Sequence, residues 1–562
     1  MDDRVRDGRP AVRSAVVGLT ILALVLRLYE LGLRNAHWDE GRVAYWILRR
    51  SVTGVWEYRP IIHGPFVQHT TRLVFELLGP TDATMRLVVA LVGGLLPLAA
   101  LLYRTRLSDA ETLALALVLS VNPLLLYFSR FLRSDVPLAA FAFVAFGFLL
   151  RGHDTNSGWH LLGAGFFLAL GATAKENVVL YLLSWAGAAT MVLAWDVWRR
   201  RDETPGEWLR HELSALADAV REHALWVLGA ALVGFLVLVV FYAPRGEAGG
   251  TVGLWAALSG SGSLLSVVEA ATLGSWHSFV DLWLAGDLHG HAYLPFLAHY
   301  LVVLLVGAGP LLAFAVVGFL DGRQRWLVAF CGWWGLSAVV GYPYATDIKA
   351  PWLAVHAVVA FAVPAAVGLV SVTRRARSAV ARGDRRVAAV FLALLLVSGG
   401  QVATVAVATS YTYPMPEANV VAQSAQPGSD LRPVVERMER AAAANDEGPD
   451  VLFYGDLAVR NESQNAEPPA GGGWYRRLPL GWYTERAGMR VTNARTTEEF
   501  PADVPPVVVV RPSEEGELPP LRGYQRYERG IFLLPEDRTV EVLGYERHFG
   551  GKSFVYYVDT SV

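Results

Sequence analysis

Cysteine is almost absent from this sequence. Of the 562 residues only Cys331 is a cysteine, and it lies inside a long apolar run. A disulfide needs two thiols and a thiolate metal site needs several, so the sequence excludes both kinds of site within one chain. Any metal site must therefore use other ligands.

Lysine is also scarce, and the net charge of the chain is small. The chain has three lysines among 49 basic residues, only 18% of its residues are charged, and its formal net charge is −2. Soluble domains carry about 25% charged residues. A nearly neutral chain of this kind gives no reason to expect a nucleic acid as partner.

Long apolar runs are what the sequence has in abundance. Apolar residues make up 53% of the chain, and the mean hydropathy is +0.35. Many runs approach 20 residues, about the length that a helix needs to cross a bilayer. The pattern predicts a polytopic α-helical membrane protein with about eleven transmembrane helices, at 13–33, 84–103, 109–128, 135–150, 158–173, 177–197, 224–243, 293–320, 326–342, 351–372 and 387–408.

Arginine placement predicts the orientation. Arginines recur in every second loop, from Arg4 to Arg386, and cytoplasmic loops carry such an excess. The first apolar segment has a basic start but lacks a small-residue cleavage site, which is typical of an uncleaved signal anchor. We therefore expect a multi-pass protein of the cell membrane with a cytoplasmic N-terminus. Its transmembrane domain covers 1–408, with a long first external loop at 34–83, and 409–562 form an extracytoplasmic domain.

The C-terminal region has a different pattern. Residues 431–444 read as an amphipathic helix, and short apolar segments at 451–454, 507–510, 531–534 and 553–558 read as strands. This predicts a small α/β or α+β domain. It contains no evident catalytic group of residues, and docking of an acceptor is one hypothesis for its role.

The first external loop opens and closes with residues that suit catalysis. His37, Asp39 and Glu40 follow the first span, and His63 precedes a Gly-Pro turn at the end of the loop. A carboxylate here can act as a general base on a hydroxyl group, at the depth where a lipid-linked substrate carries its phosphate. His63 either faces this site or is a turn residue without chemistry. The sequence thus predicts an enzyme that acts on lipid-borne groups.

Two of the three lysines fall among the predicted external residues that lie near the membrane. Lys175 and Lys349 remain lysine although the chain otherwise strongly prefers arginine. A compact ammonium group suits a phosphate oxygen. Alternatively, each lysine extends to the membrane interface and pairs with Glu176 or Asp347.

A single predicted external turn contains Arg130, Arg133 and Asp135. Two arginines outside run against the positive-inside trend. They indicate either an anionic ligand or an internal ion pair with Asp135.

Asp287, His289 and His291 have the side chains of a divalent-metal site. Their loose spacing matches none of the tight zinc patterns, so a structural or solvated role is the alternative. The cofactor is therefore unknown from the sequence, and a divalent cation is one possibility.

Several of these motifs occur in a familiar order. Asp39-Glu40 follows the first span, the His63-Gly64-Pro65 turn closes the first loop, Ser129-Arg130 and Asp135 precede the fourth span, and Thr173-Ala174-Lys175 follows the fifth. Together they resemble the GT-C superfamily over roughly residues 10–410. Within it the chain is similar to the branch of protein O-mannosyltransferases and lipid A aminoarabinose transferases, and most similar to archaeal flippase activity-associated membrane proteins.

The resemblance implies a GT-C-like fold and transfer of a sugar from a polyprenyl (dolichyl) phosphate to a glycan or protein acceptor on the extracytoplasmic face. The reaction would be inverting, with Asp39 as base and Glu40 beside it to orient the acceptor or a water. The implied lipid-phosphate site comprises His63, Arg130, Arg133, Asp135, Lys175, Glu176 and Lys349. Possible metal or acceptor contacts are His37, Asp287, His289 and His291.

Two departures from the family pattern are visible. His63-Gly64-Pro65 stands where the family often has His-Pro-Pro, and no Trp-Trp-Asp motif occurs in the external domain. The second departure argues against an oligosaccharyltransferase that reads sequons. The alternative function is non-enzymatic, as a binding or flipping partner for a dolichyl-phosphate-linked sugar in N-glycosylation.

Overall fold

The computed structural model of the chain describes residues 10–60, 63–199, 205–247, 252–285, 292–345, 349–415, 419, 421–422, 429–460, 462, 472–542 and 545–560. The chain folds into two compact units. The first comprises Met1–Tyr29, Trp56–Val67 and Leu87–Thr412, and the second comprises Glu30–Val55, Gln68–Arg86 and Tyr413–Val562.

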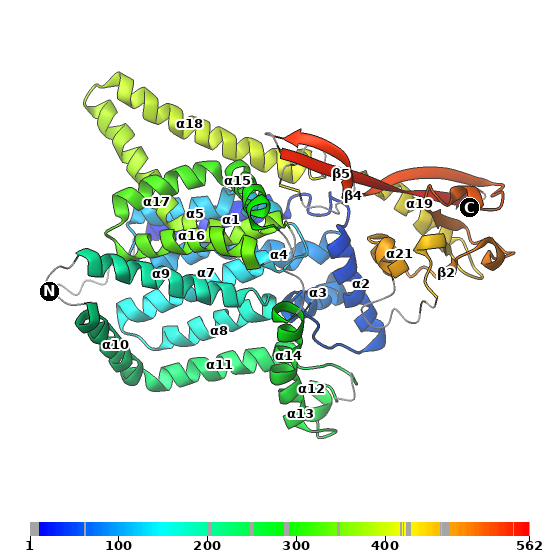
Figure 1. Cartoon of the computed structure of the whole chain (residues 1–562), viewed down its shortest axis with the longest axis horizontal. Coiled ribbons are helices and arrows are strands. Elements are labelled where there is room, and N and C mark those ends of the chain that lie inside the picture. The colour runs from blue at the N-terminus through cyan, green and yellow to red at the C-terminus, as the bar shows by residue number, and fades with distance from the viewer. Residues whose placement is uncertain are drawn as a thin grey trace. The chain divides into compact units, whose positions relative to one another are not determined.

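The first unit is helical throughout its described part (Figure 1). Its first half contains α1 (Pro10–Leu28), α4 (Thr84–Leu95), η1 (Leu96–Tyr103), α5 (Asp109–Val121), α6 (Pro123–Phe128), α7 (Asp135–Thr155), α8 (Trp159–Ala174), α9 (Val178–Arg199), α10 (Pro205–Glu222) and α11 (Ala224–Tyr242). Its second half contains α12 (Leu254–Leu258), α13 (Leu264–Glu269), η2 (Ala270–Gly274), α14 (Ser275–Phe279), η3 (Val280–Leu284), α15 (Tyr293–Gly322), α16 (Trp326–Ala345), η4 (Pro351–Leu353), α17 (Ala354–Ala381), α18 (Arg385–Val407) and η5 (Ala408–Thr412).

Eight helices of the described part are long and apolar enough to cross a membrane. The predicted fold class is therefore confirmed, while about eleven spans were expected. The difference arises at three places. The span predicted at 109–128 is divided, because Asn122 ends α5 and caps α6. The span predicted at 158–173 corresponds to α8, which has only 16 residues. The span predicted at 326–342 corresponds to α16, which contains three Trp, two Tyr and Pro343 among its 20 residues. Those polar and aromatic groups lower the hydropathy of α16 below that of its neighbours.

Helix α17 forms the centre of the first unit. Most of its residues from Ala354 to Gly368 are buried, and it packs against α5, α7, α15 and α16. Its crossing with α15 is very close, because a methyl group at Gly318 would overlap the carbonyl oxygen of Pro364. Small residues allow such backbone approach between membrane helices.

The second unit combines segments of the first loop with the C-terminal domain. From the loop come α2 (Trp38–Thr53) and most of α3 (Pro65–Leu78). The C-terminal helices are α19 (Arg432–Ala443), η6 (Gly455–Leu457), α20 (Gly472–Arg476), α21 (Leu480–Arg486), η8 (Thr497–Glu499) and η9 (Glu515–Glu517). The strands are β1 (Val451–Tyr454), β2 (Val491–Ala494), β3 (Val507–Val510), β4 (Tyr524–Val542) and β5 (Tyr545–Asp559).

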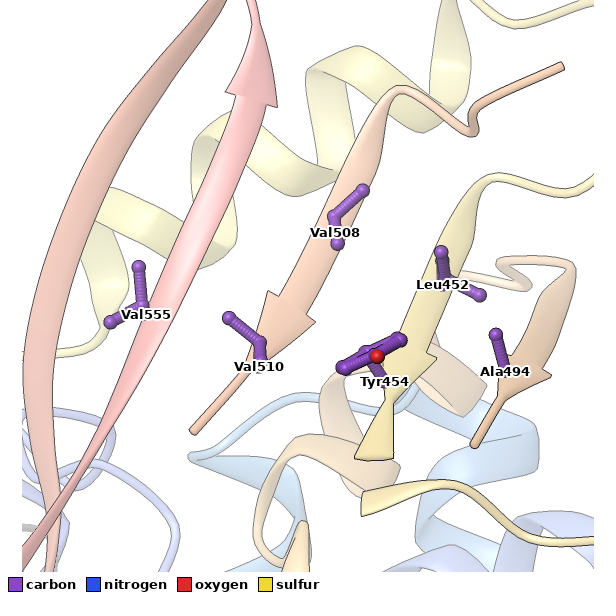
Figure 2. Packing of buried hydrophobic residues seen from close by; sticks show 6 residues of the cluster. All are labelled: Leu452, Tyr454, Ala494, Val508, Val510 and Val555. Carbon is purple, nitrogen blue, oxygen red and sulfur yellow. The ribbon is translucent and has the colours of Figure 1, made fainter. Parts of the chain in front are cut away.

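The five strands form one mixed sheet in the order β2-β1-β3-β5-β4. β1 runs parallel to β2 and β3, while β5 is antiparallel to both β3 and β4. Because side chains alternate along a strand, Leu452 and Tyr454 share a face with Val508 and Val510 and form a buried cluster (Figure 2). The predicted helix and four predicted strands are confirmed; β2 and α20 were not predicted.

The close crossing of α15 and α17 gives a test of the fold. Gly318→Ala is expected to lower the melting temperature in detergent, because overpacking a rigid contact costs about 1–3 kcal/mol. Gly399→Ala in α18 is the matched control, since a methyl group there meets no atom within 4 Å. The control should be neutral or slightly stabilising, because Ala favours helix over Gly by up to about 1 kcal/mol. Equal melting temperatures for the two variants would contradict this packing.

Candidate functional site

The turn before α2 is a well-formed helix start. His37 is the N-cap residue, its Nδ1 accepts a hydrogen bond from the backbone N–H of Asp39 at 3.0 Å, and its own N–H donates to Glu40 Oε2 at 2.9 Å. These reciprocal bonds form a capping box, which satisfies backbone N–H groups that a helix start leaves free. His37 is therefore engaged in holding the turn.

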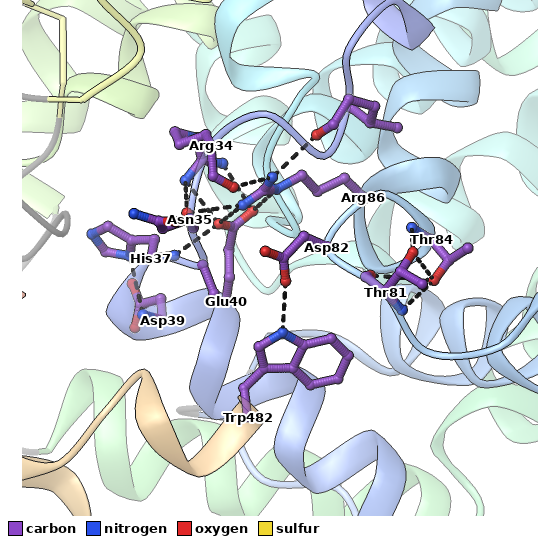
Figure 3. Close-up of polar contacts among 12 residues, drawn as sticks. Arg34, Asn35, His37, Asp39, Glu40, Thr81, Asp82, Thr84, Arg86 and Trp482 are labelled. Atoms are coloured by element: carbon purple, nitrogen blue, oxygen red, sulfur yellow. Dashed lines mark hydrogen bonds and ion pairs between the residues drawn. The ribbon is translucent and has the colours of Figure 1, made fainter. Parts of the chain in front are cut away.

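Glu40 is held by two guanidinium groups (Figure 3). Arg34 donates to it from Nη1 at 2.8 Å and from Nη2 at 3.0 Å, and Arg86 donates from Nε and Nη2 at 2.9 Å each. The side chains of Glu40 and Arg86 are completely buried. Bidentate pairs of this kind are among the strongest hydrogen bonds in proteins. We call Arg34, Glu40 and Arg86 the Glu40 clamp.

The Glu40 clamp also fixes the backbone around it. Arg86 donates to the carbonyl oxygens of Leu31, Arg34 and Asn35 at 3.1, 2.8 and 3.1 Å. Burial alone would raise the pKa of Glu40, but Arg34 and Arg86 outweigh burial and lower that pKa well below its usual range. Both oxygens of Glu40 are occupied, so its geometry gives it a structural role and does not support the predicted contact with acceptor or water.

Asp39 differs from its neighbour. Its side chain is 16% exposed and pairs with Arg42, whose Nη2 lies 3.0 Å from Asp39 Oδ1. The guanidinium of Arg42 in turn lies 4.9 Å from the ring centre of Trp38. Of the two adjacent carboxylates, Asp39 is therefore the one that a substrate can reach.

Asp82 is a buried carboxylate that the sequence analysis missed. Trp482 Nε1 donates to its Oδ1 at 2.8 Å and Tyr483 Oη donates to its Oδ2 at 3.1 Å. The same tyrosine accepts from the backbone N–H of Ala36 at 2.9 Å. Trp482 and Tyr483 of α21 thus hold the first-loop turn. The polar atoms of these two aromatic side chains were the only sequence signal for a contact with Asp82.

A cavity of about 210 Å³ in the second unit lies beside α2 and α21. Two ion pairs line it, Arg477–Glu462 at 2.7 Å and Arg49–Glu485 at 3.4 Å. Burial raises the pKa of Glu485, and Arg49 opposes that rise. The remaining lining is mostly aromatic or apolar and includes Tyr45, Trp474 and Met489.

The first unit holds a separate polar cluster, centred on Asp135 at the start of α7. Its Oδ1 accepts from Lys175 Nζ at 2.7 Å and lies 3.3 Å from His356 Nε2. The other ring nitrogen of His356 lies 2.8 Å from the hydroxyl of Tyr181. We call these four residues the Asp135 cluster. His356 and Tyr181 come from the interior of predicted spans, where sequence alone gave no sign of a site.

Two arginines of the predicted turn have different surroundings. Arg133 Nε lies 3.6 Å from Asp135 Oδ2, and the guanidinium carbon of Arg133 lies 3.6 Å from the ring centre of Trp352. Arg130 instead donates to the carbonyl oxygens of Arg27 and Tyr29 at the end of α1, at 3.0 and 2.6 Å. Arg133 therefore joins the Asp135 cluster, whereas Arg130 caps a helix end.

Lys175 and Glu176 do not pair with each other, whereas Asp347, the alternative partner of Lys349, lies outside the described residues. Lys175 pairs with Asp135 and not with Glu176. Glu176 accepts from the hydroxyl of Tyr58 at 2.6 Å, and burial raises its pKa while that hydrogen bond opposes the rise. Lys349 is exposed and forms no ion pair within the described residues.

His63 lies in a tight turn against the end of α8. It has a φ of +68°, in the left-handed region, and the next N–H, of Gly64, donates to the carbonyl oxygen of Ala174 at 3.1 Å. A side chain at Gly64 would overlap the carbonyl oxygens of Thr173 and Ala174. This contact explains the departure from His-Pro-Pro, because proline has no N–H and would collide there.

The predicted metal ligands Asp287, His289 and His291 lie outside the described residues. Within the described residues, no three His, Cys, Asp or Glu side chains gather in a way that could hold a metal ion. A divalent cation therefore stays a prediction.

Two family models match parts of the chain. Residues 62–226 match dolichyl-phosphate-mannose-protein mannosyltransferase, and residues 431–559 match the Agl23 flippase-associated protein C-terminal domain. A search of curated proteins finds no match.

Solved structures with the same fold extend over nearly the whole chain. ArnT from Cupriavidus metallidurans in the apo state is 15% identical, with 97% of this chain and 98% of that chain covered and a TM-score of 0.54. The same protein bound to undecaprenyl phosphate is 16% identical, with 96% and 97% covered and a TM-score of 0.54. The apo oligosaccharyltransferase of Archaeoglobus fulgidus is 12% identical, with 90% and 70% covered and a TM-score of 0.50.

These matches confirm the predicted fold class, since the chain shares its fold with ArnT over nearly its whole length. The two family models, over 62–226 and 431–559, agree with the resemblance that the sequence shows in those segments.

The Glu40 clamp gives a prediction on stability. Glu40→Gln removes the negative charge that two guanidiniums share, and breaking one side of a buried ion pair costs about 3–5 kcal/mol. We expect a markedly lower melting temperature than for wild type. Asp39→Asn is the matched control on the next residue, and it should melt like wild type because Asp39 is partly exposed.

The same variant should change the pH dependence. The folded-state pKa of Glu40 lies below the unfolded value of about 4.3. Its contribution to stability is therefore fully present above that value and is lost as the pH falls toward the folded-state pKa. Melting curves at falling pH should show a smaller acid-dependent loss for Glu40→Gln than for wild type. Identical losses would contradict the clamp.

Proposed function

We propose that the chain transfers a sugar from a polyprenyl (dolichyl) phosphate to an acceptor hydroxyl, with Asp39 as general base. This proposal rests on the difference in exposure between the two adjacent carboxylates. Glu40 is completely buried in its clamp, whereas Asp39 is partly exposed. The match of 62–226 to dolichyl-phosphate-mannose-protein mannosyltransferase supports the reaction class. The fold shared with ArnT, which has been solved with undecaprenyl phosphate bound, supports the carrier class.

The proposed step is an inverting displacement. Asp39 accepts the proton of the acceptor hydroxyl, whose oxygen forms a bond to the anomeric carbon. The bond between that carbon and the phosphate oxygen breaks on the opposite face, and the carrier leaves as a lipid monophosphate with the electron pair. A base in such a position contributes about 10²–10⁴ in rate.

Within the first unit, positive charge is proposed to form a binding site for a lipid phosphate. Lys175 Nζ has three donors, and one of them is directed at Asp135, which orients the ammonium group. Arg133 adds a guanidinium fixed on Trp352. His356 lies 3.3 Å from the same oxygen of Asp135, and Tyr181 holds the other ring nitrogen of His356.

The proposed topology has the N-terminus in the cytoplasm and the C-terminal domain outside. The arginine-rich loops support it, as cytoplasmic loops carry such residues. Transfer would then occur on the extracytoplasmic face, where the acceptor is a glycan or a protein.

A second function is favoured by one observation, the match of 431–559 to a flippase-associated domain. In that case the same charges bind the sugar phosphate headgroup without breaking a bond. The chain would then be a partner in translocation of the lipid-linked sugar.

The test uses purified protein in lipid with radiolabelled dolichyl-phosphate hexose and a panel of acceptors. We expect Asp39→Asn to slow the release of label from the carrier by about 10²–10⁴. Glu57→Gln is the control, since it removes another first-loop carboxylate, which is 40% exposed and pairs with Arg59. Wild-type rates in Asp39→Asn would contradict the proposal. Saturable binding without release in wild type would support the second function.

A further inference from the structure

Two neighbouring cavities open at the arginine-rich end of α17. One, of about 500 Å³, lies between α17 and α18 and is lined by Ser371, Arg374, Arg375, Ser378, Arg382 and Phe391. The other, of about 730 Å³, runs along α1, α5 and α17. Arg374 lines both, so a polar cavity continues into a mostly apolar groove. The helices concerned all belong to the first unit (Figure 1).

The polar cavity carries unbalanced positive charge. Arg375 is neutralised by Asp321, with Nη2 2.7 Å from Oδ2. Arg374 and Arg382 line this cavity, and Arg377 lines the adjoining groove. All three are exposed, and their side chains form no hydrogen bond or ion pair with any residue that the structure describes. Arginines side by side around a cavity have the donors to hold a phosphate group.

The apolar groove has the shape for a hydrocarbon chain. Leu19 of α1, Leu113 and Leu117 of α5, and Leu369 of α17 line it. Its α17 side runs from Leu369 to Arg377, eight residues along the helix, which corresponds to a rise of about 12 Å. Gly18 leaves open space on the α1 side, because a methyl group there would meet no atom within 4 Å.

This region lies far from the Asp135 cluster. His356 and Arg374 are both on α17, 18 residues apart, which corresponds to about 27 Å along the helix. The hydrocarbon core of a bilayer is about 30 Å thick. The two cavities therefore lie near the opposite membrane surface from the proposed phosphate-binding lysine.

Topology alone accounts for some of these arginines but not for the cavities. A positive-inside signal requires only that basic residues lie in the correct loop. Arg385 and Arg386 meet that need in the same loop and line neither cavity. An apolar groove that begins at an unpaired arginine is a separate feature, and basic pockets beside membrane helices are suited to anionic headgroups.

We propose that these cavities form a binding site for an anionic membrane lipid with a phosphate headgroup. The phosphate lies among Arg374, Arg377 and Arg382, and one hydrocarbon chain lies in the groove between α1, α5 and α17. The site is distinct from the one proposed for sugar transfer, and it does not depend on that function. Charge complementarity selects the headgroup, while the groove selects a lipid over free phosphate.

The test titrates delipidated full-length protein with phosphatidylglycerol and, separately, with phosphatidylcholine, and measures bound lipid by native mass spectrometry. The Arg374→Gln/Arg377→Gln variant is expected to weaken phosphatidylglycerol binding at least tenfold. Arg385→Gln/Arg386→Gln is the matched control, with the same charge change in the same loop, and should weaken it less than twofold. Gly18→Phe fills the groove without changing charge and should also weaken it at least tenfold.

Several outcomes would overturn the proposal. Equal losses in the two double variants would mean diffuse attraction by the loop charge. Equal binding of phosphatidylcholine by wild type would mean ordinary boundary lipid. An unchanged Gly18→Phe variant, together with full competition by inorganic phosphate, would mean a free-phosphate site. Melting temperatures of all variants show whether each one is folded.

Discussion

The first loop depends on one interaction, the charge-assisted contact of Glu40 with Arg34 and Arg86. Four guanidinium N–H groups and one backbone N–H meet a single buried carboxylate. Two buried cations and one anion leave a positive excess, which the carbonyl oxygens of Leu31, Arg34 and Asn35 help to stabilise. Removing such a group from water costs free energy. The contact therefore fixes the position of the first-loop turn in addition to any stability that it provides.

What the clamp positions is the turn from His37 to Asp39. The capping box joins the clamp to the start of α2, and Asp82 with the aromatic pair of α21 holds the same turn through Ala36. Asp39 is thereby placed on the first turn of a fixed helix with its carboxylate partly exposed. A general base needs this combination, because its rotamer must be restricted while its oxygens stay accessible.

The sequence predicted the parts whose signal is local. Apolar runs identified the membrane helices, and the valine-rich segment at 507–510 identified a central strand. Strand β2, Val491–Ala494, was missed because its sequence VTNA has no apolar alternation and its place depends on pairing with β1.

The candidate site was predictable only in part, for a similar reason. Asp39 and Lys175 could be found from loop position and residue type. The structural role of Glu40 could not, because Arg86 is 46 residues away and lies at the start of an apolar run. His356 and Tyr181 were missed because single polar residues inside spans carry no pattern, whereas their meeting at Asp135 is a tertiary contact.

We propose that Glu40 holds the turn and that Asp39 performs the chemistry. The most direct test measures the rate of sugar release per folded molecule for Glu40→Gln and Asp39→Asn, with the folded fraction determined on the same samples. Folded Glu40→Gln is expected to keep its rate within about tenfold of wild type, while Asp39→Asn, fully folded, is expected to lose about 10²–10⁴. The reverse pattern, a folded Glu40→Gln protein without activity and an active Asp39→Asn protein, would contradict it.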